Sequence, residues 1–493
     1  MNNLLLLLPE LIITIVAFAI LTLDMLWRGD RRSAVVTPWL ALLGAAGVLA
    51  ATIYLWPLAG QGIGVTTAAV PLLMVDHLAL FLKLLAALTV AFVGLSAVDY
   101  LKTRTPFRGE FYALTLLAGL SMMLLSAATN LIMIYLSLEF LSITSYILTG
   151  YLRRDDRSTE AAMKYFLYGA LASGVMLYGF SLLFGLTGSV DLATIQAKLA
   201  AGQPNLAVVV MAVLLMLAGF GFKIALVPFH QWSPDAYEGA PTPVTAFLSV
   251  GPKAAGLAVL ARVLLTALPT YQVNWTAILS LVAILTMFLG NLVALWQKNM
   301  KRLLAYSSIA QAGYMLIGLA AYTARPATWQ GLEGILLFLL AYLFTNLGLF
   351  AVVIAVENKT GAANIADYAG LIRRSPFLAA ALFVFMLSLV GIPPTGGFMG
   401  KLFVFGAALE QQLYLLAGLG ILNSVISVYY YFSVVRLAFF SDTPSGDEAS
   451  IRPGWALNAV IGVTLTMTLL IALYGQPFID LANSSAQLLA AAF

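Results

Sequence analysis

Four charged residues lie deep inside apolar stretches of this chain: Glu139, Lys223, Lys253 and Lys401. A charge at bilayer depth costs about 2.5–3.5 kcal/mol on insertion scales, so such residues usually face a bundle interior and mark a path for protons or ions. A lone buried carboxylate protonates unless a cation lies near it. The four residues therefore predict a proton path inside a membrane, with a static ion pair as the alternative for Glu139.

The composition is that of a polytopic membrane protein. Hydrophobic residues make up 62% of the 493 residues and charged residues 9%, whereas soluble domains carry about 25% charged residues. The mean hydropathy is +0.97. A membrane-spanning helix needs about 20 apolar residues, and fourteen such runs predict an all-α fold. They cover residues 4–26, 35–56, 73–97, 110–128, 130–150, 160–187, 206–230, 243–267, 275–296, 302–323, 332–356, 376–410, 413–440 and 454–475.

The basic residues between these runs lie almost entirely on one side of the predicted bundle. With fourteen crossings, one set of loops carries seventeen Lys and Arg residues, and the other carries Lys198 and Arg325. Because cytoplasmic loops hold the excess of basic residues, both termini are expected in the periplasm and the protein in a bacterial inner membrane. The seventeen are Arg28, Arg31, Arg32, Lys102, Arg104, Arg108, Arg153, Arg154, Arg157, Lys298, Lys301, Arg302, Lys359, Arg373, Arg374, Arg436 and Arg452.

Cysteine and histidine usage argues against a redox centre in this chain. It has no cysteine and two histidines, His77 and His230. An iron–sulfur cluster would lack its thiolate ligands, and bis-histidine haem ligation would need both histidines. The basic residues behind the net charge of +4 are concentrated in one set of loops, so the charge indicates membrane topology and not an acidic partner. The expected surroundings are therefore the lipid bilayer, with no nucleic acid.

Two of the runs are interrupted by proline. In the seventh, Val227 and Pro228 lead into a polar string that starts at His230, and in the twelfth the sequence GIPPTGG begins at Gly391. Proline removes a backbone donor and clashes with the preceding turn, and non-helical backbone at membrane depth is buried or lines a water-filled cavity. Both helices are therefore predicted to be discontinuous. His230, beside the first break, could relay protons because of its reference pKa of about 6.5, or could cap helix carbonyls.

The two interruptions occupy equivalent places when the runs are grouped in fives. Runs four to eight and nine to thirteen each have the broken helix as fourth member, and because five is odd the two units cross the membrane in opposite directions. Paired broken helices in inverted repeats point to the transport site; two unrelated proline kinks are the alternative. The predicted organisation is three N-terminal helices in 1–100, repeats in 101–270 and 271–440, and a loop and C-terminal helix in 441–493.

Two further basic residues within the runs, and one polar group at the start of a run, are predicted to lie at the membrane surface. Lys164 and Arg262 are close to the ends of their runs, so their long side chains can snorkel to water. The group Asp76, His77 and Lys83 falls at the start of the third run and is predicted to form a solvated boundary.

Several motifs resemble one family of membrane proteins. The string PDAYEGAPTPVTAFLSVGPK from Pro234 to Lys253 resembles subunit N of the proton-pumping NADH-quinone oxidoreductase, respiratory complex I, whose mitochondrial relative is subunit 2. Further matches are LEFLSITSYILTGY from Leu138, EAAMKYFLYGALASG from Glu160, MKRLLAYSSIAQAGYMLIGL from Met300 and GIPPTGGFMGKLFVF from Gly391. The Mrp-type sodium/proton antiporters share the Pro-Thr-Pro-Val core but typically carry a His-containing stretch where this chain has DAYEG, which favours subunit N.

The resemblance implies a fold, site residues and partners. The fold would have fourteen helices with two inverted five-helix repeats, and the proton-path residues would be Glu139, Lys223, Lys253 and Lys401. NAD, FMN, iron–sulfur clusters and quinone would be bound by other subunits, with no cofactor in this chain. The partners would be other membrane subunits, including neighbouring antiporter-like ones. Many relatives have His where Gln311 stands, which argues against a titratable relay at that position.

The leading hypothesis is a non-redox subunit of a proton-translocating NADH:quinone oxidoreductase. At about 4 Å and an effective dielectric near 20, the Glu139–Lys223 attraction is roughly 4 kcal/mol, so a small movement could switch Lys223 between holding and releasing a proton. Lys253 would then pass protons toward Lys401. The predicted secondary residues of this path are His230, Ser307, Ser308 and Gln311.

Two other functions stay open on the sequence. A stand-alone or Mrp-type sodium/proton antiporter would exchange ions without partners, and the Pro-Asp-Ala-Tyr-Glu string argues against it. A structural scaffold between pumping subunits would hold its charges in static pairs. The central position of Lys253, without an obvious partner in the sequence, argues against a scaffold.

Overall fold

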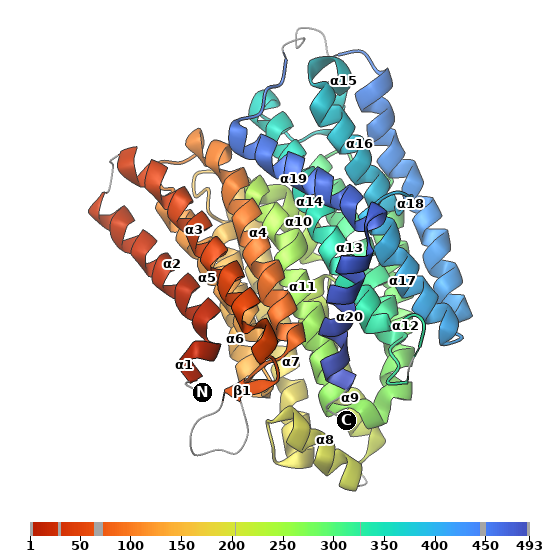
Figure 1. The fold of residues 1–493 in the computed structure, drawn as a ribbon. Helices are drawn as coiled ribbons and strands as arrows, with labels where there is room; N and C mark the ends of the chain where they lie inside the picture. Colours follow the sequence, from red (N-terminus) through yellow and green to blue (C-terminus); the bar gives the residue numbers. More distant parts are fainter. Residues whose placement is uncertain are drawn as a thin grey trace.

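The computed structural model describes residues 3–27, 31–63, 72–202, 204–325, 327–443 and 450–490. Arg28, one of the seventeen basic loop residues, lies outside these ranges. The chain is a helical bundle, with one antiparallel pair of three-residue strands, β1 (Gln61–Ile63) and β2 (Leu73–Val75), in the described ranges. The predicted all-α membrane fold is confirmed. The N- and C-terminal ends lie at the same end of the bundle (Figure 1).

Thirteen helices of the described ranges are long and apolar enough to cross a membrane. They correspond, in order, to thirteen of the fourteen runs. These helices are α2 (Leu8–Leu26), α3 (Arg31–Leu55), α4 (His77–Lys102), α5 (Gly109–Ala127), α6 (Leu131–Thr149), α7 (Asp156–Thr187), α9 (Leu206–Ile224), α11 (Thr242–Ala267), α12 (Gln272–Ala294), α13 (Met300–Ala320), α14 (Gly331–Thr360), α18 (Tyr414–Phe440) and α19 (Trp455–Leu473).

The twelfth run, residues 376–410, folds as two 15-residue helices, α16 (Pro376–Val390) and α17 (Gly396–Glu410), each shorter than a full crossing. Several short elements were not predicted from the sequence, because hydropathy over long windows does not register them. They are α1 (Asn3–Leu6), α8 (Leu192–Ala201), α10 (Trp232–Gly239), α15 (Leu371–Arg374), α20 (Gln476–Ala490) and the 3-10 turns η1 (Trp56–Leu58), η2 (Pro269–Tyr271) and η3 (Ile365–Tyr368).

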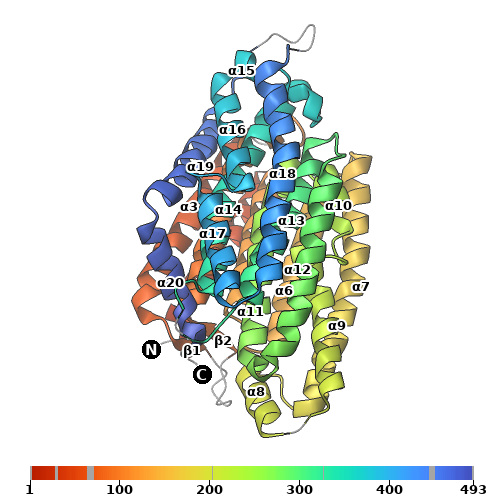
Figure 2. The same ribbon diagram turned by 90° about the vertical axis from the view of Figure 1, so that its right-hand side faces the viewer.

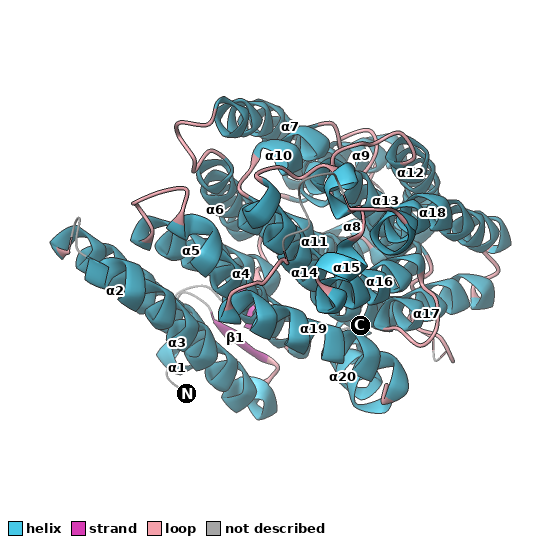
Figure 3. Cartoon of the chain, turned by 90° about the horizontal axis from the view of Figure 1, so that it is seen from above, coloured by secondary structure: helices cyan, strands magenta, loops and turns pink. Residues whose placement is uncertain are grey.

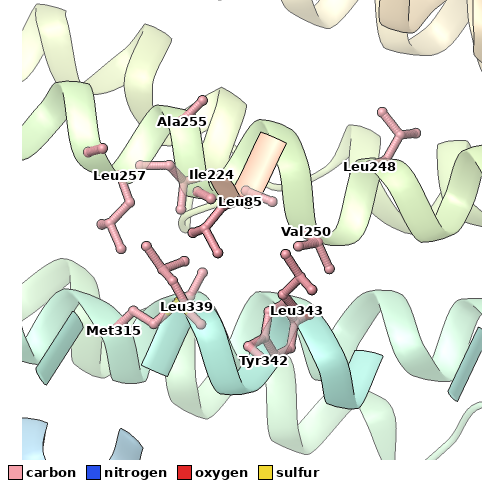
Figure 4. Packing of buried hydrophobic residues seen from close by; sticks show 14 of the residues in the cluster. Leu85, Ile224, Leu248, Val250, Ala255, Leu257, Met315, Leu339, Tyr342 and Leu343 are labelled. Carbon is pink, nitrogen blue, oxygen red and sulfur yellow. The ribbon is translucent and has the colours of Figure 1, made fainter. Parts of the chain in front are cut away.

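Two helices, α11 and α14, form the centre of the bundle, with α2 and α18 at opposite edges (Figure 3). Every residue in the apolar window of α11 and of α14 is buried, as expected for helices that are apolar on all sides. Val250 of α11 lies opposite Leu343 of α14 in this core (Figure 4). Helices α7 and α9 pack side by side on one flank, and α20 lies on the other (Figure 2). Polar side chains on α11 and α14 are therefore shielded from lipid by the surrounding helices.

Two buried ion pairs tie the N-terminal helices to the bundle. Arg262 of α11 donates two hydrogen bonds to the Asp76 carboxylate, of 2.6 and 2.8 Å, and Asp76 also caps α4 by accepting from the Ala79 amide at 2.7 Å. Lys83 of α4 lies 2.7 Å from the Glu10 carboxylate of α2. A charge that is enclosed by helices has lost its contact with water, so it needs a partner of opposite charge.

The prediction that Arg262, Asp76 and Lys83 lie at the membrane surface is therefore wrong. Arg262, Asp76 and Lys83 are 3%, 6% and 0% exposed, because α4 and α5 pack against α11 and α3 packs against α4. The sequence placed each residue near a run boundary but could not show what packs over that boundary. Lys164, in contrast, has a side chain that is 41% exposed, between Glu160 and Asp235.

Removing one partner of the Asp76–Arg262 pair leaves a buried charge unpaired. We expect Arg262→Met to lower the free energy of unfolding by about 3–5 kcal/mol, measured by thermal melting of the purified protein. Adding Asp76→Asn should recover part of this loss, because asparagine keeps the helix cap without the charge. Equal melting of the Arg262→Met variant and the parent would show that this pair does not stabilise the fold.

Candidate functional site

Both runs that were predicted to be interrupted by proline contain a gap between two helices. Helix α9 ends at Ile224, with Ala225 in the left-handed region at φ 64°, and α10 starts at Trp232. Helix α16 ends at Val390, with Gly391 at φ 89°, and α17 starts at Gly396. Each first segment thus ends in a left-handed residue, which closes the last turn and directs the chain away from the helix axis.

Lys223 lies in the last turn of α9 and is fully buried. Its Nζ donates to the Ser142 hydroxyl of α6 at 3.1 Å and to the Tyr165 hydroxyl of α7 at 3.4 Å. Gly256 of α11 packs beside it: a Cβ at that position would lie 3.6 Å from the Lys223 Cβ. The ammonium therefore sits where α6, α7, α9 and α11 meet, held by hydroxyls.

Glu139 is near Lys223 but does not contact it. Among the described residues, no ion pair within 4.0 Å joins the two, and Lys223 bonds instead to Ser142, about one turn further along α6. The Glu139 Oε1 atom is buried without a hydrogen-bond partner. The outward face of α6 around Glu139 is otherwise apolar and exposed, with Leu136 56% and Ile143 53% exposed. The carboxylate thus lies at the edge of the bundle.

Lys253 lies in the middle of α11 and is 3% exposed. Its Nζ donates to the Ser308 carbonyl at 2.8 Å and to the Ser308 hydroxyl at 2.6 Å. That hydroxyl also accepts from Tyr342 of α14 at 2.9 Å and lies 3.5 Å from the Tyr237 hydroxyl of α10. The predicted residue Ser308 is therefore the point where groups from four helices meet around Lys253.

A line of polar groups continues from this point toward the second break. Ser307, next to Ser308 on α13, shares a short hydrogen bond with the Tyr431 hydroxyl of α18. Tyr431 lies 3.4 Å from the Gln311 amide nitrogen, which also donates to the Leu389 carbonyl at 2.8 Å. The predicted residues Ser307 and Gln311 thus lie on one route that leads to the end of α16.

Lys401 closes this line. Its Nζ donates to the carbonyls of Leu389 at 3.0 Å and Val390 at 2.8 Å, and to the Ser424 hydroxyl at 3.2 Å. These carbonyls end α16 and have lost their helical donors at the break. Gly391 permits the approach, since a Cβ there would come within 2.8 Å of the Lys401 side chain. The break thus supplies the ligands of the ammonium group.

The structure separates the remaining predicted residue, His230, from this line. His230 lies in the turn between α9 and α10, and its Nδ1 is buried without a hydrogen-bond partner. Sequence reasoning also missed the tyrosines that join the lysines. They are Tyr165, Tyr237, Tyr342 and Tyr431, together with Tyr314, whose ring lies 4.3 Å from the Lys401 ammonium. A polar tip on an aromatic body inside an apolar run is the signal that would have found them.

Ion pairs hold α10 at the end of the bundle that carries most basic loops. Asp235 accepts from Lys164 at 2.9 Å and from Arg302 at 2.6 Å, and Arg302 also binds Glu238 at 3.1 Å. Burial alone raises the pKa of the Asp235 carboxyl, but the hydrogen bonds and charges of Lys164 and Arg302 outweigh burial and hold the pKa below its ordinary value. This anchor fixes α10, and with it Tyr237, against α13.

Comparison with known proteins places the chain in a family. Residues 128–427 match the model of the NADH:quinone oxidoreductase/Mrp antiporter transmembrane family. The chain belongs to this family of antiporter-like membrane proteins.

Individual relatives are similar over most of their length. The chain is 42% identical, over 85% of its length and 83% of the relative, to NADH-quinone oxidoreductase subunit N 2 of Chloroherpeton thalassium. It is 42% identical, over 97% of its length and 91% of the relative, to NAD(P)H-quinone oxidoreductase subunit 2 of Gloeobacter violaceus. A chain of respiratory complex I from Thermus thermophilus with bound aureothin is similar in structure, with a TM-score of 0.79 and 33% identity over 96% of this chain and 98% of that one.

The α10 anchor should depend on pH. A lowered carboxyl pKa stabilises the fold above the unfolded value of about 3.9, and the stabilisation is lost as the pH falls through the folded pKa. We expect Asp235→Asn to lower the free energy of unfolding at neutral pH by about 1 kcal/mol, since the pairs are partly exposed. The difference from the parent should shrink below about pH 4. Thermal melting across this range checks the prediction, with Glu160→Gln, which alters one exposed pair, as control.

Proposed function

We propose that this chain is the subunit N of a proton-translocating NADH-quinone oxidoreductase and carries protons through the membrane while other subunits oxidise NADH and reduce quinone. The observation that carries the proposal is the polar line from Lys253 through Ser308, Ser307, Tyr431 and Gln311 to the carbonyls that bind Lys401. The names of the relatives support the reaction. Electron transfer would take place elsewhere, so this chain would be a non-redox subunit whose partners bind NAD, FMN, iron–sulfur clusters and quinone.

The lysines would carry protons by alternating between charged and neutral forms. A neutral Lys253 amine can accept a proton. When Lys253 gives up that proton again, the Ser308 hydroxyl is free to bond with Tyr237 or Tyr342. Hydroxyl and amide groups between Lys253 and Lys401 can reorient and order water, which relays protons without a change in their own net charge. Lys401, with three acceptors around its ammonium group, would be the next station.

Glu139 would act as the electrostatic control of Lys223. The carboxylate and the ammonium are not in contact, so their attraction is weaker than the roughly 4 kcal/mol expected at about 4 Å. An approach would favour the charged form of Lys223, and a separation would favour release of its proton. The gap between the two groups supports a switch and disfavours a static pair.

The exposed face of α6 supports contact with a neighbouring membrane subunit. Glu139 shares that face with apolar side chains, and a carboxylate facing lipid is costly. A partner that covers the face would shield Glu139 and place its own groups within reach of it. Antiporter-like subunits of the same complex are the partners proposed from the sequence.

The helix order supports the proposed repeats of residues 101–270 and 271–440. The units would be α5, α6, α7, α9 with α10, and α11, followed by α12, α13, α14, α16 with α17, and α18. The third member is the longest single helix in each unit, with 32 and 30 residues. Lys223 precedes its break whereas Lys401 follows its break, so the two lysines would have related but unequal roles.

The proposed orientation places both termini in the periplasm of a bacterial inner membrane. The N- and C-terminal ends share one end of the bundle (Figure 1), and most basic loop residues are at the other. The positive-inside rule supports the cytoplasm for the basic end.

The two alternative functions are not favoured. The matched relatives carry quinone oxidoreductase names, which disfavours a stand-alone or Mrp-type sodium/proton antiporter. A scaffold would have static ion pairs at its central lysines. In the described part of the chain, Lys223, Lys253 and Lys401 have hydroxyl and carbonyl partners and no carboxylate within 4.0 Å.

Removing either member of the control pair should weaken pumping without preventing assembly. We expect Lys223→Ala and Glu139→Ala complexes to assemble and to lose at least about tenfold in coupled NADH oxidation and proton pumping, as for loss of a positioned acid–base group. The measurements are quinone-dependent NADH oxidation and acidification of sealed vesicles. Full activity in assembled variants would refute the assignment of these residues.

Proton transfer along the polar line between Lys253 and Lys401 should slow when the side-chain amide of Gln311 is removed. Gln311→Leu keeps a similar volume but cannot bond to Tyr431 or Leu389. We expect proton pumping to fall about tenfold, while Gln311→His, which can relay protons, retains most of the rate. Gln297→Leu is the control, because Gln297 lies in the loop after α12, outside the polar line, and its side-chain amide donates to the Val293 carbonyl of α12. Equal rates for Gln311→Leu and Gln297→Leu would exclude this route.

A further inference from the structure

A stripe of hydroxyls leads along α11 from the basic end of the bundle to Lys253. Thr242, Thr245 and Ser249 precede Lys253 at intervals of three and four residues, which places all four on one face of the helix. All three hydroxyl residues are fully buried. Successive members are separated by about 5 Å along the axis, a gap that one water molecule can bridge.

A carboxylate stands at the outer end of this stripe. Glu357 of α14 accepts a short hydrogen bond from the Thr242 hydroxyl and another from Tyr100 at 3.3 Å. Its side chain is 12% exposed and lines a surface cavity of about 590 Å³, together with Tyr100 of α4, Arg104 in the turn after α4, and Arg153. Glu357 therefore connects water in the cavity with the first hydroxyl of α11.

Groups from α14 and a proline converge on the inner part of the stripe. Asn346 of α14 donates to the Ser249 hydroxyl at 2.5 Å, one turn before Lys253. Pro252 lies inside α11 and has no N–H group, so the Leu248 carbonyl beside Ser249 loses its helical donor. A polar amide and a free carbonyl next to a buried hydroxyl supply the partners that an internal water needs.

We infer that Glu357 takes up protons from the cavity at the basic end and that Thr242, Thr245, Ser249 and Asn346 conduct them to Lys253. This proton-uptake route rests on the proposed function and deepens it, because it supplies Lys253 without passing through Lys223. The proton moves from the Glu357 carboxyl through hydroxyls and bridging water to the Lys253 amine. Each intermediate accepts one proton and releases another, so the net change is a carboxylate at Glu357 and an ammonium at Lys253.

Charges around Glu357 favour its role as a collector. Arg104 lies 3.4 Å from its carboxylate, and Lys301 of α13, which donates to the Ala240 carbonyl at 2.7 Å, acts on it electrostatically. The Tyr100 and Tyr368 hydroxyls face it as well. Arg104 and Lys301 thus place positive charge near the carboxylate, at the point where the cavity meets the first hydroxyl of α11.

The test uses the assembled complex in sealed native-membrane vesicles that are energised with NADH. We expect Ser249→Ala to slow the initial rate of proton pumping at least about threefold, as for loss of one hydrogen-bonded step. Ser121→Ala is the matched control. Ser121 of α5 is also fully buried and also donates to the carbonyl three residues before it, at 2.7 Å, as Ser249 does.

Variants of Glu357 add a readout that a purely structural role would not change. We expect Glu357→Gln to slow pumping about tenfold near pH 8.5, where protons are scarce, and by less near pH 6.5, with Glu357→Asp restoring most of the rate. Equal rates for Ser249→Ala and Ser121→Ala, or a Glu357→Gln defect that does not change with pH, would overturn the uptake route. Gln311→Leu in the same assay separates the two proposals: if it slows pumping and the Ser249 and Glu357 variants do not, the proposed function stands and this route fails; if Gln311→Leu, Lys223→Ala and Glu139→Ala all pump at the parental rate, the proposed function fails.

Discussion

The cost of holding lysine ammonium groups away from water is the constraint on which the rest of this structure depends. Lys223, Lys253 and Lys401 are at most 4% exposed, and a desolvated charge persists only where hydrogen bonds replace its lost water. The fold meets this need with hydroxyls at Lys223 and Lys253 and with helix-end carbonyls at Lys401. None of these ligands carries a full charge, so under the proposed function each ammonium would be stabilised enough to exist and weakly enough to give up its proton.

The separate helices at each break, the tyrosines and the apolar packing of the core follow from that constraint. The break after Val390 frees the carbonyls that bind Lys401, and the glycine at 391 lets its side chain approach. The hydroxyl of Tyr431 links Ser307 to Gln311 where no charged side chain intervenes. Around this line, α11 and α14 are packed with apolar side chains (Figure 4). Apolar packing confines polar groups to one path, which is the condition for carrying protons without leakage.

The sequence predicted the membrane fold, the proline interruptions of two apolar runs and the buried position of the lysines, because each of these follows from a rule that acts locally. Hydropathy identifies the membrane-spanning runs, and a proline identifies a position where a helix loses a backbone hydrogen-bond donor. A charged residue inside an apolar run identifies a candidate functional site. Partners distant in the sequence were not predictable in this way. Arg262 meets Asp76 across 186 positions, Glu10 meets Lys83 between separate helices, and the tyrosines join the line only after packing. Short helices such as α10 and α20 were missed because tertiary contacts, and not long apolar runs, hold them.

The central claim is that Lys253 is a working proton carrier and not a structural cation. The most direct measurement is the number of protons pumped per NADH oxidised by assembled complex with Lys253→Met, which keeps the length and removes the charge. The account predicts normal assembly with pumping lost or lowered at least about tenfold, and electron transfer slowed with it where the two are coupled. An assembled Lys253→Met complex that pumps at the parental rate and proton yield would contradict the account.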